Sequence, residues 1–316
     1  MEDMTSFDAL LLLSFGGPEG PDDVLPFLEN VTRGRNIPRA RLEKVGEHYH
    51  LFGGVSPINQ QCRELKAAIE ADFAAHGVDL PVYWGNRNWT PYLADTVRQM
   101  TADGVRRAAA FVTSAYSGYS TNDQYLNDIA RAREEVPGAP EIDKLPVYCG
   151  RPGFIEPFVD AARDALSRLQ GDVRLVFTAH SVPLSQPNYE LYVAELEQTA
   201  RTVAEKAAPG TPWDLVYQSR SGSPDQPWLE PQITDHLEKL RGEGVRAVAA
   251  VPVGFVSDHM EVKYDLDVEA AGRAAELGIA FARAATPGAA PRFAALPREL
   301  LAEVGALPAR TTGETG

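Results

Sequence analysis

The stretch VPVGFVSDHMEVKYDLDVEA, residues 251–270, decides how the rest of this chain is interpreted. Its first part, Val251–Val256, is a continuous apolar run, which predicts a buried strand. The pattern then becomes polar and helical, and Glu261, Asp265 and Glu269 follow one another at intervals of four residues. This spacing places three carboxylates on one face of a helix. Because like charges so placed destabilise a solvated helix by roughly 0.2–0.5 kcal/mol per pair, we expect the row to attract a metal ion.

The same residues also fit a plainer interpretation. Asp258 is a good N-cap residue, and Glu261 three positions later completes the capping-box pattern. Asp265 and Glu269 would then be ordinary solvated acids. Because short patterns of this kind often match by chance, other parts of the sequence must decide between a metal path and a capped surface helix.

Composition indicates a soluble globular protein and argues against several functions. The 316 residues suffice for two domains, and the hydrophobic content is 44%. The formal net charge of −14 argues against nucleic acid as a partner. No apolar run approaches the ~20 residues of a membrane span, and the N-terminal MEDMTSFDAL lacks the basic start of a signal peptide. We therefore expect a cytoplasmic enzyme that is not an integral membrane protein.

Apolar runs alternate with amphipathic segments along the chain, which predicts alternating strands and helices. Strands are expected at residues 8–15, 81–85, 105–113, 145–149, 173–178, 213–218, 251–256 and 279–283. The two halves also resemble each other, because GVRRAAAFVTSAYS from Gly104 matches GVRAVAAVPVGFVS from Gly244. We predict an α/β fold of two similar Rossmann-like units, each a four-stranded parallel sheet flanked by helices, with the active cleft between them. The expected parts are an N-terminal unit (1–150), a C-terminal unit (151–290), and a terminal helix with a disordered tail (291–316) that packs back on the first unit.

A single histidine gives the acidic row a possible partner. His180 ends the strand predicted at residues 173–178, and Ser181 and Pro183 follow it. A histidine in this position is often structural. Here Glu261 follows a strand of the same unit, so an imidazole nitrogen and a carboxylate oxygen can form a sparse, open site. Such a site suits an ion that must leave again, and His180 can alternatively accept protons.

The first half of the chain offers different chemistry. Four arginines, at positions 33, 35, 39 and 41, form a basic cluster that is either a solvated face or a docking site for carboxylates. Ser56 lies in a glycine-rich loop, and Tyr116 and Tyr125 follow the third predicted strand, where ligands of open α/β sheets bind. We expect the first half to grip a large aromatic anion and the second half to deliver an ion to it.

Taken together, these motifs resemble those of the ferrochelatase family over nearly the whole length of the chain. The segments that carry the resemblance are LLLSFGGPEGP (11–21), RGR (33–35), LFGGVSPINQ (51–60), FTAHSVP (177–183), QSRSG (218–222) with Pro227-Trp228, and VPVGFVSDHMEVKYDLDVE (251–269). The family inserts Fe²⁺ into a porphyrin. The resemblance therefore implies a chelatase-like fold and a lyase activity.

The resemblance also implies roles for particular residues. His180 and Glu261 would handle the iron and the pyrrole protons, and the sequence does not decide which of them takes the protons. Asp265 and Glu269 would line the metal path. Some relatives have a tyrosine at the position of Phe15 that can ligate iron in the product complex, which phenylalanine cannot do. The implied porphyrin-binding residues are Phe15, Arg33, His48, Tyr49, Ser56, Tyr116 and Tyr125.

Within the family, the compact length and the missing targeting segment resemble the coproporphyrin III ferrochelatases of actinobacteria. The implied reaction is insertion of Fe²⁺ into coproporphyrin III to give coproheme in heme biosynthesis, and the four substrate carboxylates would explain the arginine cluster. A protoporphyrin IX ferrochelatase, a cobalt or nickel chelatase acting on sirohydrochlorin, and a non-catalytic tetrapyrrole or metal carrier stay open as alternatives. We expect a monomer that contacts other heme-pathway enzymes transiently.

Iron is a substrate in this scheme, and no organic cofactor is expected. Some actinobacterial relatives bind a [2Fe–2S] cluster through four cysteines. This sequence has two, Cys62 and Cys149, which are far apart and form no CxxC pattern. Because two thiolates cannot supply four ligands, we expect no such cluster, no disulfide scaffold and no zinc site built by the protein.

Overall fold

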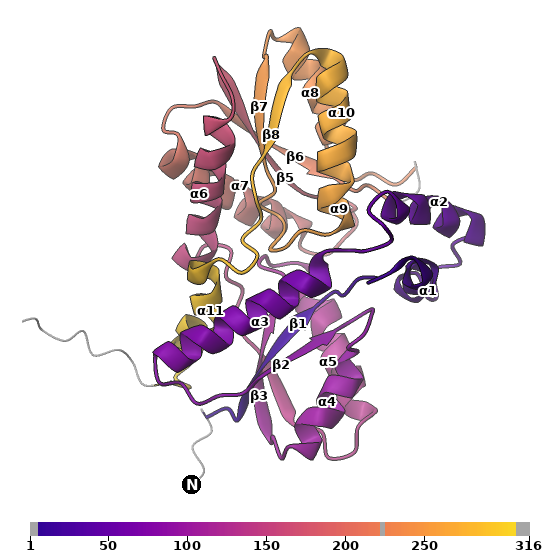
Figure 1. Cartoon of the computed structure of the whole chain (residues 1–316), viewed down its shortest axis with the longest axis vertical. Coiled ribbons are helices and arrows are strands. Elements are labelled where there is room, and N and C mark those ends of the chain that lie inside the picture. The colour runs from indigo at the N-terminus through magenta and orange to yellow at the C-terminus, as the bar shows by residue number, and fades with distance from the viewer. Residues whose placement is uncertain (1–5, 222–224, 308–316) are drawn as a thin grey trace, which may run out of the picture.

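The computed structural model describes residues 6–221 and 225–307, without the side chains of residues 120 and 121. In this part of the chain, two parallel sheets of four strands lie one above the other along the long axis of the molecule (Figure 1). The first sheet has the order β2-β1-β3-β4, with β1 (Ala9–Ser14), β2 (Val82–Asn86), β3 (Arg107–Val112) and β4 (Glu141–Lys144). The second repeats this order as β6-β5-β7-β8, with β5 (Val173–His180), β6 (Trp213–Gln218), β7 (Ala247–Val251) and β8 (Ala280–Arg283). The predicted fold class is therefore confirmed.

Helices cover both faces of each sheet. The first half contains α1 (Pro21–Val31), α2 (Arg39–His50), α3 (Ile58–Ala75), α4 (Leu93–Ala102), the π-helix η1 (Ser120–Gln124) and α5 (Tyr125–Glu134). The second half contains α6 (Pro152–Ser167), α7 (Tyr189–Ala207), α8 (Ile233–Gly242), α9 (Met260–Lys263), the π-helix η2 (Asp265–Ala270), α10 (Ala271–Leu277) and α11 (Pro291–Glu303).

The strand β1 shows why the apolar runs become central strands. All six of its residues are buried. Leu10 and Leu12 pack on the side of α3, whereas Leu11 and Leu13 pack on the opposite side, among residues of α4 and α5. Successive side chains of a strand point to opposite faces, so a strand covered on both sides must be apolar throughout.

The last helix, α11, joins the two units. Its buried residues Phe293 and Leu300 belong to the same core as residues of α3 and α6. The side chain of Arg298 pairs with Asp72 of α3 at 2.7 Å, and Glu303 pairs with Arg151 at 2.6 Å. Figure 1 shows α11 beside the lower ends of α6 and α3. The helix therefore packs on both units, and the predicted unit boundaries remain a prediction; the tail after residue 307 lies outside the described residues.

Two predicted strands lie at other positions. The strand expected at 251–256 is β7, which ends at Val251. Residues 252–257 form a buried turn instead, in which Gly254 N–H donates to Thr178 C=O at 3.0 Å across the end of β5. A Cβ at Gly254 would lie 2.6 Å from Ala179, so glycine permits this close approach. The strand expected at 145–149 is β4, which ends at Lys144, and the segment after it is a loop in which Leu145 and Tyr148 are buried.

The helix α2 was missed in the sequence, because Gly34 and Pro38 interrupt the segment before it. Pro38 is in fact the residue that precedes the first helical turn. Figure 1 shows α1 and α2 projecting from the first unit toward α9 of the second. The ring of His48 in α2 stacks on Tyr264 with centroids 3.6 Å apart, so this projection contacts the acidic segment of the other unit.

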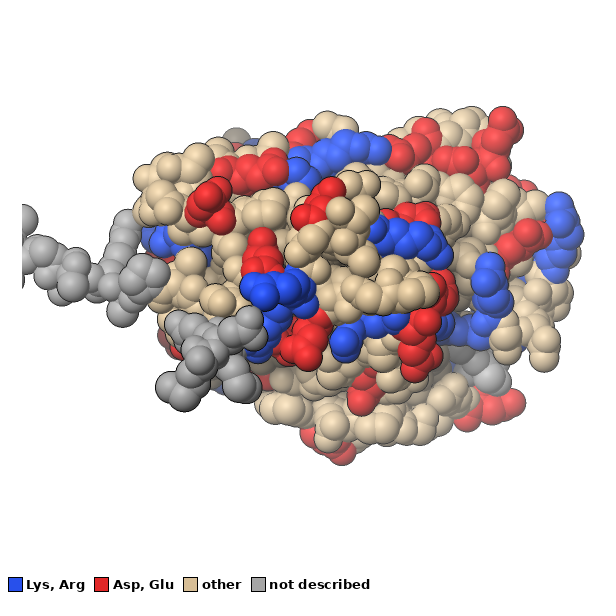
Figure 2. Space-filling model, turned by 90° about the horizontal axis from the view of Figure 1, so that it is seen from below, with Lys and Arg blue, Asp and Glu red and all other residues tan. Residues whose placement is uncertain are grey.

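The net charge of −14 is not concentrated on the face seen in Figure 2. Acidic and basic side chains are interspersed there and do not form one patch of a single sign. Within residues 6–221 and 225–307, no helix combines the length and the apolar character that a membrane span requires.

Candidate active site

His180 and Glu261 meet at the carboxyl ends of the second sheet. His180 is the last residue of β5, and Glu261 lies in α9, which follows the turn after β7. The imidazole Nε2 is 3.4 Å from the Glu261 Oε1, with 32% and 45% of the two side chains exposed. The pair is thus close enough to share one proton or one ion while staying accessible to solvent.

The second ring nitrogen of His180 is also engaged. Nδ1 lies within hydrogen-bonding distance of the Ser181 carbonyl, which can only accept, so Nδ1 carries a proton. The Tyr192 hydroxyl donates to the carbonyl of His180 at 3.2 Å. The Nδ1 contact fixes the orientation of the ring and directs Nε2 toward Glu261, where a metal ion or a proton can bind, and the Tyr192 contact holds the backbone at the end of β5.

The pair is charged at neutral pH. Burial alone would lower the pKa of His180, but the adjacent Glu261 carboxylate outweighs burial and raises it to about 9. Burial would likewise raise the pKa of Glu261, but the His180 imidazolium lowers it to about 2. The site therefore contains an imidazolium–carboxylate pair, and an arriving cation must displace the proton that it holds.

The acidic row continues from this pair into the π-helix η2. Asp265 begins the π-helix, in which Glu269 N–H donates to Tyr264 C=O five residues back at 3.0 Å. Burial raises the pKa of Asp265 to about 7, and the neighbouring Glu261 and Glu269 contribute to the rise. The hydroxyl of Ser219 donates to the Asp265 carboxylate and opposes it. The carboxylates are thus close enough to influence one another, and Glu269 lies at the exposed end of the row.

The capping-box interpretation of this segment is wrong. The residue that caps α9 is His259, whose Nδ1 accepts from Glu261 N–H at 3.2 Å. Asp258 instead pairs with Arg283 and accepts from the Thr286 hydroxyl at 3.0 Å. The start of α9 is therefore capped by His259, and Asp258 is bound to Arg283 and Thr286 and does not cap the helix.

Sequence reasoning missed two residues at the end of β6. The side-chain amide of Gln218 donates to the backbone carbonyl of Glu261, and Ser219 contacts Asp265 as described above. Ser219 has a φ of +62°, a left-handed conformation that is strained for serine. Both residues lie in the QSRSG motif (218–222), and this motif is the sequence feature that could have identified them as site residues. The register pairs Gln218 with His180 across β5 and β6, which places the glutamine beside the His180–Glu261 pair.

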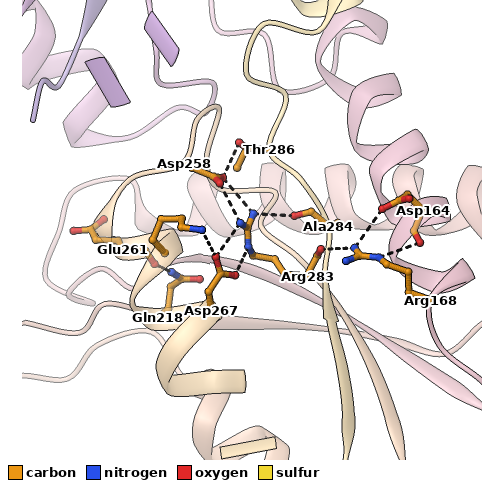
Figure 3. Close-up of polar contacts among 10 residues, drawn as sticks. Asp164, Arg168, Gln218, Asp258, Glu261, Asp267, Arg283, Ala284 and Thr286 are labelled. Atoms are coloured by element: carbon orange, nitrogen blue, oxygen red, sulfur yellow. Dashed lines mark hydrogen bonds and ion pairs between the residues drawn. The ribbon is translucent and has the colours of Figure 1, made fainter. Parts of the chain in front are cut away.

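An arginine network supports the other side of the acidic segment (Figure 3). The guanidinium of Arg283, at the end of β8, donates to both carboxylate oxygens of Asp258 at 3.2 and 3.0 Å and to those of Asp267 at 2.5 and 3.0 Å. Lys263 also pairs with Asp267 at 2.8 Å. In Figure 3 the carboxylate of Glu261 points away from this network.

Two predicted porphyrin-binding residues of α2 lie against the acidic segment. His48 stacks on Tyr264. Burial raises the pKa of the Tyr49 hydroxyl, with further contributions from the negative charges of Glu261 and Asp265. The stack of His48 on Tyr264 therefore places α2 beside the acidic segment of the second unit.

The other predicted residues of the first unit differ in accessibility. Phe15 is 37% exposed at the end of β1, and the Arg87 guanidinium lies 5.8 Å from its ring centroid. Arg33 is exposed in the turn after α1. Ser56 is buried, and its N–H donates to Pro18 C=O at 2.8 Å, so its loop packs on the glycine turn that follows β1.

Tyr116 and Tyr125 lie in the core. Each residue is 3% exposed. Tyr116 donates to Val253 C=O at 2.8 Å and thereby joins the first unit to the turn that precedes α9. Tyr125 packs under Arg87, whose guanidinium is 4.7 Å from the ring centroid. Neither tyrosine presents a ring face to solvent in this structure.

The donors do not form a closed metal site. Over residues 6–221 and 225–307, no three histidine, cysteine, aspartate or glutamate side chains converge as a ligand set for a metal ion. One imidazole nitrogen and one carboxylate oxygen suit brief contact with an ion in transit, because structural sites use four protein ligands.

The arrangement has the fold of metal chelatases. The sirohydrochlorin chelatase SirB from Bacillus subtilis subspecies spizizenii, solved in complex with cobalt, superposes with a TM-score of 0.55 at 12% identity, covering 95% of this chain and 96% of SirB. The ferrochelatase family model matches residues 7–304. The chain belongs to the ferrochelatase family.

Close relatives occur among actinobacteria. The coproporphyrin III ferrochelatase of Mycolicibacterium smegmatis is 57% identical over 318 residues, covering 98% of this chain and 93% of the relative. The coproporphyrin III ferrochelatase of Streptomyces griseus is 55% identical over 325 residues, covering 96% of this chain and 87% of the relative.

Proposed function

We propose that this protein is a coproporphyrin III ferrochelatase, a lyase that inserts Fe²⁺ into coproporphyrin III to give coproheme in heme biosynthesis. The observation that carries the proposal is the 3.4 Å approach of the His180 Nε2 to the Glu261 Oε1 at the carboxyl ends of the second sheet. Membership of the ferrochelatase family and the names of the actinobacterial relatives support the choice of reaction and porphyrin.

The porphyrin would lie between the units, with its carboxylates directed toward the arginines around α1 and α2. Of the four arginines in that cluster, Arg39 already pairs with Glu29 and Glu43, and Arg41 donates to the Ser221 carbonyl. Arg33 and Arg35 are exposed in the turn between the helices. We assign the propionate contact to these two residues, because guanidinium groups bind carboxylates through paired hydrogen bonds.

Iron would reach the ring along Glu269, Asp265 and Glu261. In the resting pair the His180 proton is held by the negative charge of Glu261. A cation that reaches Glu261 cancels this charge, so the imidazole loses its proton to solvent. The neutral Nε2 can then bind the ion or accept a pyrrole proton, while Nδ1 stays bonded to the Ser181 carbonyl.

The deciding experiment is anaerobic Fe²⁺ insertion into coproporphyrin III and protoporphyrin IX, followed by absorbance with the full-length chain. We expect multiple turnovers with coproporphyrin III and slower reaction with protoporphyrin IX. His180→Ala should abolish insertion while leaving porphyrin binding within about twofold, and His76→Ala, at an exposed histidine beyond α3, should react like the parent. A preference for protoporphyrin IX would refute the substrate. A signal that stops at one equivalent would indicate a non-catalytic carrier.

The finer points of the proposal follow from the same reaction. We propose a cytoplasmic monomer that contacts neighbouring enzymes of the pathway transiently and binds no nucleic acid. Sedimentation of the purified chain at micromolar concentration tests the monomer, and a dimer mass would refute it.

A further inference from the structure

The acidic segment carries five carboxylates within twelve residues, and the structure sorts them into two groups. Glu261, Asp265 and Glu269 face the proposed metal route. In the described part of the chain, neither Asp265 nor Glu269 pairs with a lysine or an arginine. Asp258 and Asp267 are paired with Arg283, and Asp267 is also paired with Lys263. The two groups are interleaved along the segment, so their order in the sequence alone does not separate them.

The pairing by Arg283 is tight. Its side chain is 14% exposed, and those of Asp258 and Asp267 are 17% and 26% exposed. Four hydrogen bonds of 2.5–3.2 Å join the guanidinium to the two carboxylates. Because both fork edges of the arginine are used, each carboxylate is held in a fixed orientation and its charge is neutralised where solvent screens it little.

The arginine also borders a pocket that has more carboxylates than cations. A pocket of about 450 Å³ is lined by Glu64, Asp164 and Asp258, together with Arg168 and Arg283. Without Arg283, three carboxylates would line this space with Arg168, which pairs with Asp164, as the one arginine left among the described lining residues. Divalent ions prefer clustered carboxylates, so the pocket would then compete with the metal route.

We propose that Arg283 determines which carboxylates bind the incoming iron, because it keeps Asp258 and Asp267 in ion pairs that prevent them from binding the ion. This role rests on the proposed chelatase function and deepens it. Arg283 does not touch the reacting atoms, and it acts through the charge and orientation of the two aspartates. Loss of the guanidinium would open a second cation site beside the route.

The direct test counts bound metal ions without porphyrin. Mn²⁺ is titrated into the parent chain, Arg283→Gln and Arg273→Gln by calorimetry and electron paramagnetic resonance. Arg273 is the matched control, because it also joins two carboxylates, Glu238 and Glu276. We expect Arg283→Gln to bind at least one more Mn²⁺ than the parent and Arg273→Gln to bind the parent number. Equal numbers in the parent and Arg283→Gln would overturn the proposal.

A second arm separates this role from simple loss of structure. Adding Asp258→Asn to Arg283→Gln should restore the parent Mn²⁺ number. In the insertion assay, Arg283→Gln should raise the KM for Fe²⁺ at least fivefold and leave the KM for coproporphyrin III within twofold. An equal rise in both constants would indicate a structural role and reject the proposal.

A third arm does not need Arg283 to be changed. Asp267→Asn should leave the KM for Fe²⁺ within twofold, whereas Glu269→Gln, two positions along the same segment, should raise it at least fivefold. The reverse order would contradict the sorting of carboxylates. A parent chain without any iron insertion would refute the proposed function alone, because the Mn²⁺ count is independent of turnover.

Discussion

Replacing Glu261 by glutamine removes the charge that holds the proton on His180. The pKa of His180 is raised from 6.5 to about 9 although burial opposes the rise, and the nearby carboxylate is the main reason. Glutamine has nearly the same shape but no charge, and the burial remains. We therefore expect the pKa of His180 to fall to 6.5 or below in Glu261→Gln.

The same substitution changes stability in a defined pH window. Because the pKa of His180 is raised on folding, its contribution is complete below 6.5 and is lost as the pH rises through about 9. Because the pKa of Glu261 is lowered from 4.5 to about 2, its contribution is complete above 4.5 and is lost as the pH falls through about 2. Both side chains are about a third or more exposed, so solvent screening limits the pair to about 1 kcal/mol. Glu261→Gln should lose about this amount at about pH 5.5 and almost none at about pH 10.

The measurement is a proton–nitrogen NMR titration of histidine-labelled protein. The chain has six histidines, and the resonance that disappears in His180→Ala identifies the one of interest. Urea unfolding at the two pH values gives the stability difference. If the midpoint of His180 stays near 9 in Glu261→Gln, then Glu261 is not what holds the proton, and the account of the resting pair is wrong.

Three further expectations follow from the same geometry. If iron must displace the proton of His180, the KM for Fe²⁺ should rise about tenfold for each pH unit below about 9, and a flat profile would exclude the displacement. Ser219→Ala should raise both the pKa of Asp265, to above 7, and the KM for Fe²⁺, because it removes the hydrogen bond from Ser219. Ser219→Gly loses the same hydrogen bond, but its free energy of unfolding should be about 1 kcal/mol higher than that of Ser219→Ala, because glycine relieves the left-handed strain. Gly254→Ala should lower the free energy of unfolding by about 1–3 kcal/mol, since its Cβ would lie 2.6 Å from the neighbouring strand. Gly272→Ala, which has open space around it in α10, should raise the free energy of unfolding by up to about 1 kcal/mol, and equal effects of the two substitutions in chemical denaturation would contradict the packing argument.

The sequence was sufficient for the fold because its strongest signals are apolar runs of strand length. The Leu10–Leu13 run and the repeated GVR segments predicted two four-stranded parallel sheets, which the structure has, but not the order of the strands within them. Boundaries failed where an apolar segment continues past a strand end. Val251–Val256 is uniformly apolar, and only the approach of Gly254 to β5 distinguishes the turn from the strand.

The site was predicted in part for a related reason. His180 and Glu261 follow strands of one sheet, so the rule for parallel strands brought them together. The spacing of Asp265 and Glu269 survives the π-helix, because four residues are close to one turn in either helical form. Spacing places Asp267 four residues after its partner Lys263, but it could not show the second partner, Arg283, which lies sixteen residues away on another element. Contacts between distant segments carry no local pattern.

The position of α11 has a consequence for synthesis of the chain. Phe293 and Leu300 complete a core whose other side is built from β1 and α3, near the start of the chain. During translation the first unit must therefore wait, with an apolar face uncovered, until about residue 300 has left the ribosome. A nascent chain in this interval exposes an apolar face to which chaperones can bind. A stop codon just before α11 would release a protein whose apolar face stays exposed, because neither unit can cover it.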